Sequence, residues 1–359
     1  MSTILTDRQT DRQRNSSLEL LRVLCIFGII SMHSFGPFLS NCSGINLVYG
    51  TFINSVFNMG VTIFMLITGY FGTQFSKKVV RIELMMWEYG LLSVVITVLI
   101  SHYIPWKELY MSIFPVATNK YWYITSYILI VCLSGFINKI SEKLDRKQML
   151  GLLFILIVFF YIMPSFIIKE ILGDNGKGCI NMFIVYLIGR YIRKYHDDDK
   201  SVKKLLLLSV IPIAICFVGN LAMSLLFYKG HGFMGLLGRD NSIFILAGAT
   251  LIFVAFNNCV FYSKKINTVA SCVLGAYLFE GTVRLVLNNY LNWKLYETSD
   301  FLWIICILYS LIVLLICIVI EYIRNVCIKN IETRISDIVA ELCNKLLGQV
   351  KERLKNYIA

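Results

Sequence analysis

Long apolar stretches separated by short polar loops run along the chain from residue 18 to residue 324. A helix needs about 20 mainly apolar residues to cross a hydrocarbon layer roughly 30 Å thick, and it satisfies its own backbone groups, which lipid cannot do. The pattern therefore predicts an all-α fold, a polytopic transmembrane helix bundle of about ten spans. The predicted spans, of which the sixth is short, are residues 18–39, 47–71, 84–104, 120–138, 149–168, 179–193, 205–228, 241–262, 267–289 and 301–323.

The composition excludes an ordinary water-soluble domain. Hydrophobic residues make up 57% of the 359 residues and charged residues 16%, and the mean hydropathy is +0.69. The eleven cysteines are scattered, with no paired metal-type spacing. They are interpreted as small apolar residues.

The placement of Lys and Arg predicts that both termini face the cytoplasm, because basic residues are retained on that side. With ten spans, the four inner loops hold fifteen Lys and Arg and the five outer loops hold seven. The net charge of +12 then reflects topology and attraction to anionic inner-leaflet lipid, and no soluble basic domain exists to bind nucleic acid. We expect a multi-pass protein of the plasma membrane, in contact with membrane lipid.

The two ends of the chain are polar. Residues 1–17 lack the order of a cleaved signal peptide, so they are predicted to be a cytoplasmic segment before a transmembrane domain at 18–324. Residues 325–359 are predicted to be a cytoplasmic amphipathic helical tail. Its role is either packing and anchoring or binding of a partner. Its apolar residues at helical spacing are Ile331, Ile335, Ile338, Leu342, Leu346 and Val350.

The first apolar stretch carries three ionisable residues, Glu19, Arg22 and His33. A rotation of 100° per residue puts Arg22 and His33 within about 20° of each other, and Glu19 within about 60° of both. Ionisable groups in a span normally face the bundle interior or a water-filled cavity, so the stripe predicts a polar path. Alternatively, the Glu19–Arg22 pair reaches the headgroups, and His33 is a packing residue.

This first stretch, with Glu-x-x-Arg, an apolar run and then His, resembles the acyltransferase-3 family of integral membrane O-acyltransferases. Three later segments resemble further family motifs in the same order, and one of them is similar to the polysaccharide O-acetyltransferase-like branch. They are GVTIFMLITGYF (60–71), NKYWYITSYILIVCLSGFIN (119–138, the branch-type segment) and ASCVLGAYLFEGT (270–282). The resemblance thus covers residues 18–282.

The resemblance implies an O-acyltransferase that moves an acyl group, commonly acetyl, from cytoplasmic acyl-CoA to a hydroxyl of a cell-surface or lipid-linked sugar. A hydroxyl is a poor nucleophile until a general base takes its proton, and imidazole titrates near physiological pH. His33 is therefore the candidate base, or an acyl relay. Arg22 and Glu19 are the catalytic candidates beside it.

Acetyl-CoA as the donor carries several phosphate charges, so the inner mouth of the path should be basic. Lys77, Lys78 and Arg81 follow the second span at the place where the family usually has a basic cluster. A positive-inside bias alone also explains basic residues there.

The donor's carbonyl needs hydrogen-bond donors for its developing oxyanion. Arg22, Thr68 and Tyr70 are the candidates, and Thr68 stands where the family usually has Ser. Gly69 and Gly72 would let a ligand approach the backbone closely.

The sugar acceptor is expected to contact aromatic and loop residues on the outer side. Tyr121, Trp122 and Tyr123 could stack on a sugar, although an interfacial aromatic belt explains them equally well. His231 and Arg239 lie in a glycine-rich outer loop that either contacts the acceptor or simply connects two spans.

Glu280 stands where the family's late motif usually has His. Arg284 follows one helical turn later, so the two side chains can form an i, i+4 ion pair. Paired, Glu280 would be charged and would support the site. Unpaired, it would be protonated and could replace the histidine in proton handling.

No metal site is predicted. The run His196–Asp199 is interpreted as a solvated charge run. A transporter or flippase for a glycan or a lipid-linked precursor is the alternative function, because it too needs a polar stripe in an apolar bundle. It would be expected to carry more charge within its spans.

Overall fold

Within the described residues, each predicted span is mostly helical. The computed structural model describes residues 15–75, 77–166, 170–195 and 201–358, so residues 1–14 and the His196–Asp199 run lie outside the described ranges. The helices are α1 (Ser16–Phe35), η2 (Gly36–Phe38), α2 (Gly44–Phe57), α3 (Met59–Phe71), α4 (Lys77–Ser101), α5 (Trp106–Ile113), α6 (Trp122–Lys143), α7 (Arg146–Ile157), η3 (Val158–Ile162), α8 (Met163–Phe166), α9 (Cys179–Tyr195), α10 (Val202–Phe227), η4 (Leu236–Gly238), α11 (Ile243–Asn258), α12 (Lys264–Ala270), α13 (Val273–Tyr290), η5 (Trp293–Leu295), α14 (Leu302–Cys327) and α15 (Lys329–Ile358).

The predicted all-α polytopic bundle is confirmed. Within the described ranges, eight helical segments are long and apolar enough to cross a membrane, and α12 with α13, bent by 51°, forms a ninth candidate. The predicted sixth span is α9, whose 17 residues extend about 25 Å at 1.5 Å per residue. It is therefore shorter than the hydrocarbon layer of roughly 30 Å.

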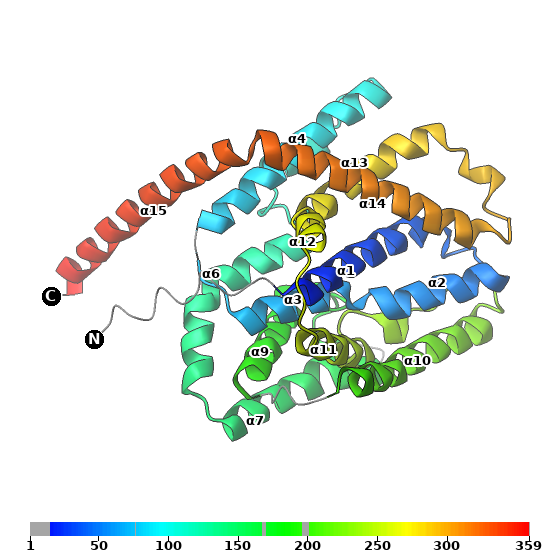
Figure 1. Cartoon of the computed structure of the whole chain (residues 1–359), viewed down its shortest axis with the longest axis horizontal. Helices are drawn as coiled ribbons and strands as arrows, with labels where there is room; N and C mark the ends of the chain where they lie inside the picture. Colours follow the sequence, from blue (N-terminus) through cyan, green and yellow to red (C-terminus); the bar gives the residue numbers. More distant parts are fainter. Residues whose placement is uncertain (1–14, 76, 167–169, 196–200, 359) are drawn as a thin grey trace.

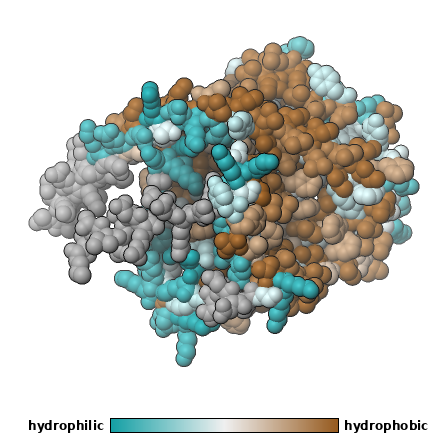
Figure 2. Space-filling model, in the orientation of Figure 1, coloured by the Kyte–Doolittle hydropathy of each residue, from teal (hydrophilic) through white to brown (hydrophobic). Residues whose placement is uncertain are grey.

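Polar and apolar residues are distributed along the bundle as a membrane requires. The beginning of α1 and the junction of α14 with α15 lie toward the same end (Figure 1). Hydrophilic residues gather at that end around a recess and again at the opposite edge, and apolar residues cover the surface between them (Figure 2). Such a surface suits hydrocarbon. The cytoplasmic placement of the termini stays a prediction.

Helix α1 lies inside the bundle and contacts α2, α3, α11, α12, α13 and α14. The side chain of Asn15 accepts a hydrogen bond from the backbone N–H of Ser17 at 3.0 Å, which caps the beginning of the helix. The turn at Gly36 and Pro37 ends it. Ile26 and Ile30 are fully buried, so packing fixes the rotation of α1 and hence the directions of its polar residues.

Helices α3 and α9 cross at a pair of glycines. A Cβ atom on Gly69 would lie 2.3 Å from the backbone oxygen of Tyr186, and one on Gly189 would lie 2.6 Å from the backbone oxygen of Leu66. Small residues let helix backbones approach this closely. The predicted approach of a ligand to Gly69 is therefore wrong, because α9 fills that space. Gly72, with φ of +69°, caps the end of α3.

Candidate active site

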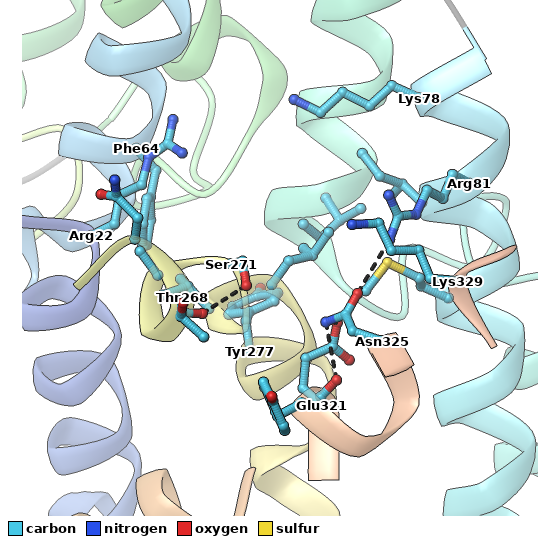
Figure 3. A pocket seen from close by; sticks show the side chains of 18 of the residues that line it. Arg22, Phe64, Lys78, Arg81, Thr268, Ser271, Tyr277, Glu321, Asn325 and Lys329 are labelled. Carbon is cyan, nitrogen blue, oxygen red and sulfur yellow. Dashed lines mark hydrogen bonds between the residues drawn. The ribbon is translucent and has the colours of Figure 1, made fainter. Parts of the chain in front are cut away.

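A cavity of about 740 Å³ lies between α1, α3, α4, α6 and the segment from α12 to α15. Its volume is within the roughly 300–1,000 Å³ of small-molecule sites. Side chains converge on it from opposite walls, with Arg22 on one side, Lys78, Arg81 and Lys329 on the other, and Tyr277 between them (Figure 3).

The cavity wall is strongly basic. Arg22 comes from α1, Lys78 and Arg81 from α4, Lys264 from α12 and Lys329 from α15. Basic groups in a concave site focus a positive potential that attracts anions. The sequence predicted the first three of these residues. Lys264 was missed because it was assigned to an inner loop, and Lys329 because it was assigned to the C-terminal tail.

The C-terminal helix contacts the predicted basic cluster directly. Nε of Arg81 lies 3.2 Å from a carboxylate oxygen of Glu332, and Nζ of Lys77 lies 2.7 Å from a carboxylate oxygen of Asp337. Arg81 lines the cavity, but Lys77 is not among the lining residues. The structure thus brings two members of the predicted Lys77–Arg81 cluster to the cavity and leaves the third outside it.

The predicted oxyanion donors separate in the structure. Thr68 lines the cavity, but its hydroxyl donates to the backbone oxygen of Phe64 at 2.9 Å. Tyr70 is not a lining residue. Its hydroxyl accepts hydrogen bonds from Arg193 and Asn257, each at 3.2 Å. Arg22 is thus the predicted oxyanion donor that keeps charged N–H groups at the cavity wall.

The predicted pair on α1 is present. Nη1 of Arg22 lies 3.5 Å from a carboxylate oxygen of Glu19. The Glu19 side chain is 7% exposed and that of Arg22 is 31% exposed. Tyr123 and Tyr277 line the same cavity, and their rings meet edge to face, with centroids 6.1 Å apart. Arg22 and these two aromatic rings therefore line the same cavity.

Helices α1 and α13 carry a hydrogen-bonded triad, formed by His33, Glu280 and Arg284. Nδ1 of His33 lies 2.8 Å from Oε1 of Glu280, and Nε of Arg284 lies 2.5 Å from Oε2 of Glu280. Arg284 also donates to the backbone oxygen of His33 at 3.2 Å. The predicted i, i+4 pair of Glu280 with Arg284 is confirmed, and the contact of Glu280 with His33 was not anticipated.

The triad fixes the chemistry of the imidazole. Glu280 is buried, and a neighbouring guanidinium favours its charged form. A carboxylate can only accept hydrogen bonds, so Nδ1 of His33 must carry the proton. In neutral His33 the lone pair is then on Nε2. This is the tautomer that a general base needs.

The five residues predicted to bind a sugar do not form one site. Tyr123 lines the basic cavity instead of an outer belt, and Trp122 packs on the core. Tyr121 also packs there. Arg239 pairs with Glu170 at 2.6 Å. His231 is exposed and is absent from the cavity lining.

A comparison with known families decides the class of protein. A family model described as an acyltransferase domain matches residues 15–322. The chain belongs to the acyltransferase-3 family. No curated protein and no solved structure matches the chain. It is a multi-pass membrane acyltransferase.

No metal-type cluster is found in the described part of this acyltransferase, where no group of three or more His, Cys, Asp or Glu side chains is arranged to hold an ion. The run at His196–Asp199 lies outside that part.

A buried ion cluster that the sequence did not reveal joins three helices of the acyltransferase beside the cavity. Arg324 on α14 contacts Glu321 at 2.7 Å, Glu88 on α4 at 2.8 Å, and Glu332 on α15. Glu321 also accepts a hydrogen bond from the hydroxyl of Tyr89 at 2.5 Å. The side chains of Arg324, Glu321 and Glu332 are at most 6% exposed. The cluster therefore holds α15 against the bundle at the cavity wall.

Proposed function

We propose that this acyltransferase moves an acetyl group from cytoplasmic acetyl-CoA to a hydroxyl of a cell-surface or lipid-linked sugar at the plasma membrane. In this proposal residues 18–324 form the catalytic domain, and both termini are cytoplasmic. The triad of His33, Glu280 and Arg284 carries the proposal, because an imidazole held in one tautomer by a carboxylate is suited to activate a hydroxyl.

The large cavity supports the donor half of the proposal. Its basic residues match the phosphates of coenzyme A, since Lys and Arg are the usual partners of phosphate oxygens. Arg22 lines the cavity, and His33 follows it by eleven residues on the same helix. That interval is about 16 Å along the axis. The extended arm of coenzyme A would carry the thioester from the basic wall toward His33.

The transfer step needs no reactant besides acetyl-CoA and the sugar. Nε2 of His33 takes the proton of the sugar hydroxyl as its oxygen attacks the acyl carbon. The new C–O bond forms and the C–S bond breaks. The imidazolium, stabilised by the Glu280 carboxylate, then returns the proton to the sulfur of coenzyme A.

The test compares the wild-type protein with His33→Ala in lipid nanodiscs, with labelled acetyl-CoA as donor. Mass spectrometry of surface glycans in cells with and without the gene identifies the product as a base-labile acetyl ester. We expect His33→Ala to lose transfer while its thermal unfolding midpoint stays near that of the wild type. His102→Ala, the same change at an exposed residue, is the control. Full transfer by well-folded His33→Ala would refute the mechanism.

A further inference from the structure

A second cavity, of about 210 Å³, lies where the end of α1, the end of α13 and the beginning of α14 meet. Ser34 and Phe38 line it from the α1 side, and Arg284 and Asn288 line it from α13. Arg284 is the residue that holds Glu280 and donates to the backbone of His33. The second cavity therefore adjoins the triad, on the side away from the beginning of α1.

Aromatic rings form one wall of the second cavity. Trp293 contacts Phe38, with ring centroids 5.3 Å apart and planes at 53°, and Tyr309, with centroids 5.1 Å apart and planes at 82°. Aromatic faces carry partial negative charge. They suit the C–H groups of a sugar ring, which are weakly positive.

Polar groups beside these rings can exchange hydrogen bonds with the hydroxyls of a ligand. Oδ1 of Asn288 accepts from the indole N–H of Trp293 at 2.9 Å and from the hydroxyl of Tyr309 at 2.7 Å. These bonds fix the amide, so that its NH₂ group supplies the remaining donors. The exposed carboxylate of Glu297 lines the same cavity and supplies acceptors. A ligand with hydroxyls, each both donor and acceptor, satisfies both groups.

We infer that the second cavity binds one neutral pyranose ring of the acceptor next to His33. This inference rests on the proposed function, and it identifies where the acceptor binds. A volume of about 210 Å³ is below the roughly 300–1,000 Å³ that drug-sized ligands occupy, which limits the ligand to a single ring. The charge of Arg284 is matched by Glu280, so the carboxylate of Glu297 disfavours acidic sugars.

Saturation-transfer NMR on the protein in nanodiscs tests the inference, with the methyl glycosides of glucose, galactose, N-acetylglucosamine and glucuronic acid as probes. We expect at least one neutral glycoside to bind and the glucuronide to bind more weakly. Trp293→Ala should lower the affinity for the neutral glycoside about fivefold to tenfold, as loss of an aromatic partner does. Leu295→Ala, at an exposed position in the same short helix η5, should bind like the wild type.

Glu297→Gln keeps the test decisive if Trp293→Ala fails to fold, because Glu297 is exposed. It should bring the glucuronide's affinity close to that of the neutral glycosides. The inference is overturned if no neutral glycoside binds the wild type, if folded Trp293→Ala binds as well as the wild type, or if Glu297→Gln leaves the glucuronide unchanged. Retained acetyl transfer by His33→Ala, together with normal glycoside binding, would refute the proposed catalysis and leave this site standing.

Discussion

Glu280 on α13 accepts a hydrogen bond from Nδ1 of His33 on α1 at 2.8 Å, although the two residues are 247 positions apart in the chain. The contact joins the helix that begins beside the basic cavity to the helix that ends beside the second cavity. By the sequence resemblance, Glu280 also stands where the late motif of the acyltransferase-3 family usually has His. The carboxylate at this position is thus a direct hydrogen-bond partner of His33, the candidate base.

We expect Glu280→Gln to lower kcat by up to about 10⁴-fold, the effect seen when the carboxylate behind the histidine of a catalytic triad becomes an amide. An amide can donate to Nδ1, which would move the proton to Nε2 and remove the basic lone pair. The KM for acetyl-CoA should stay near the wild-type value, since the basic wall is untouched. Steady-state kinetics in nanodiscs measure both, and Glu83→Gln on α4 is the matched control. An unchanged kcat would remove Glu280 from the mechanism.

Glu280→His restores the usual family residue, and we nevertheless expect it to be less active than the wild type. The substitution leaves Arg284 without its counter-charge and places two imidazoles side by side. Breaking a buried ion pair costs about 3–5 kcal/mol, so the thermal unfolding midpoint should fall as well. Activity equal to or above wild type would mean that the position handles protons, and that this chain uses a carboxylate to do so.

Replacing Lys77, Lys78 and Arg81 together with Gln should raise the KM for acetyl-CoA more than it lowers kcat, because phosphate contacts far from the reacting atoms provide uniform binding. Lys78→Gln alone should account for much of the change, about fivefold if its contact is worth roughly 1 kcal/mol. Lys77→Gln alone should do less, since Lys77 pairs with Asp337 outside the cavity lining.

Basic residues also set topology, so a second triple variant separates the two effects. Lys139, Lys143 and Arg146 belong to another predicted inner loop, and none of them lines the cavity. Their replacement with Gln should leave the KM for acetyl-CoA unchanged. If both triple variants raise it equally, the Lys77–Arg81 cluster is an orientation signal and does not bind the donor.

Much of the fold could be predicted because hydropathy and helix length are local properties. The first span was expected at 18–39 and runs from Ser16 to Phe38 with its short 3-10 turn. The 51° bend between α12 and α13 and the break between α2 and α3 at Asn58 were not predicted, because each lies inside a stretch that was expected to be one continuous span. A bend depends on neighbouring helices, which the local pattern does not describe.

The candidate site likewise has features that the sequence predicted and features that it did not. The pair of Glu280 with Arg284 follows from i, i+4 spacing on one helix, so the sequence predicted it. The partner of His33 depends on how α1 and α13 rotate against each other, which no spacing encodes. Lys329 was missed for a similar reason, because its place at the cavity wall depends on the docking of α15 through Glu332.

Arg324→Gln should destabilise the protein by about 3–5 kcal/mol, the usual effect of removing one partner from a buried ion pair. The change leaves Glu321 buried without its cation and Glu332 with Arg81 as its remaining cation, and we expect a lower thermal unfolding midpoint in detergent. Arg334→Gln, an exposed position on α15, is the control and should unfold like the wild type. Equal midpoints for both variants would show that the cluster contributes little to stability.

The close crossing of α3 and α9 gives the last prediction. Gly69→Ala would put a Cβ atom 2.3 Å from the backbone oxygen of Tyr186. The helices must separate, at about 1–3 kcal/mol for an overpacked core. A Cβ atom on Gly135 of α6 would meet nothing within 4 Å. Gly135→Ala should therefore raise the free energy of unfolding by up to about 1 kcal/mol through helix propensity. Because α3 carries Thr68 to the cavity, the KM for acetyl-CoA should rise in Gly69→Ala and not in Gly135→Ala. Equal unfolding midpoints would contradict this packing.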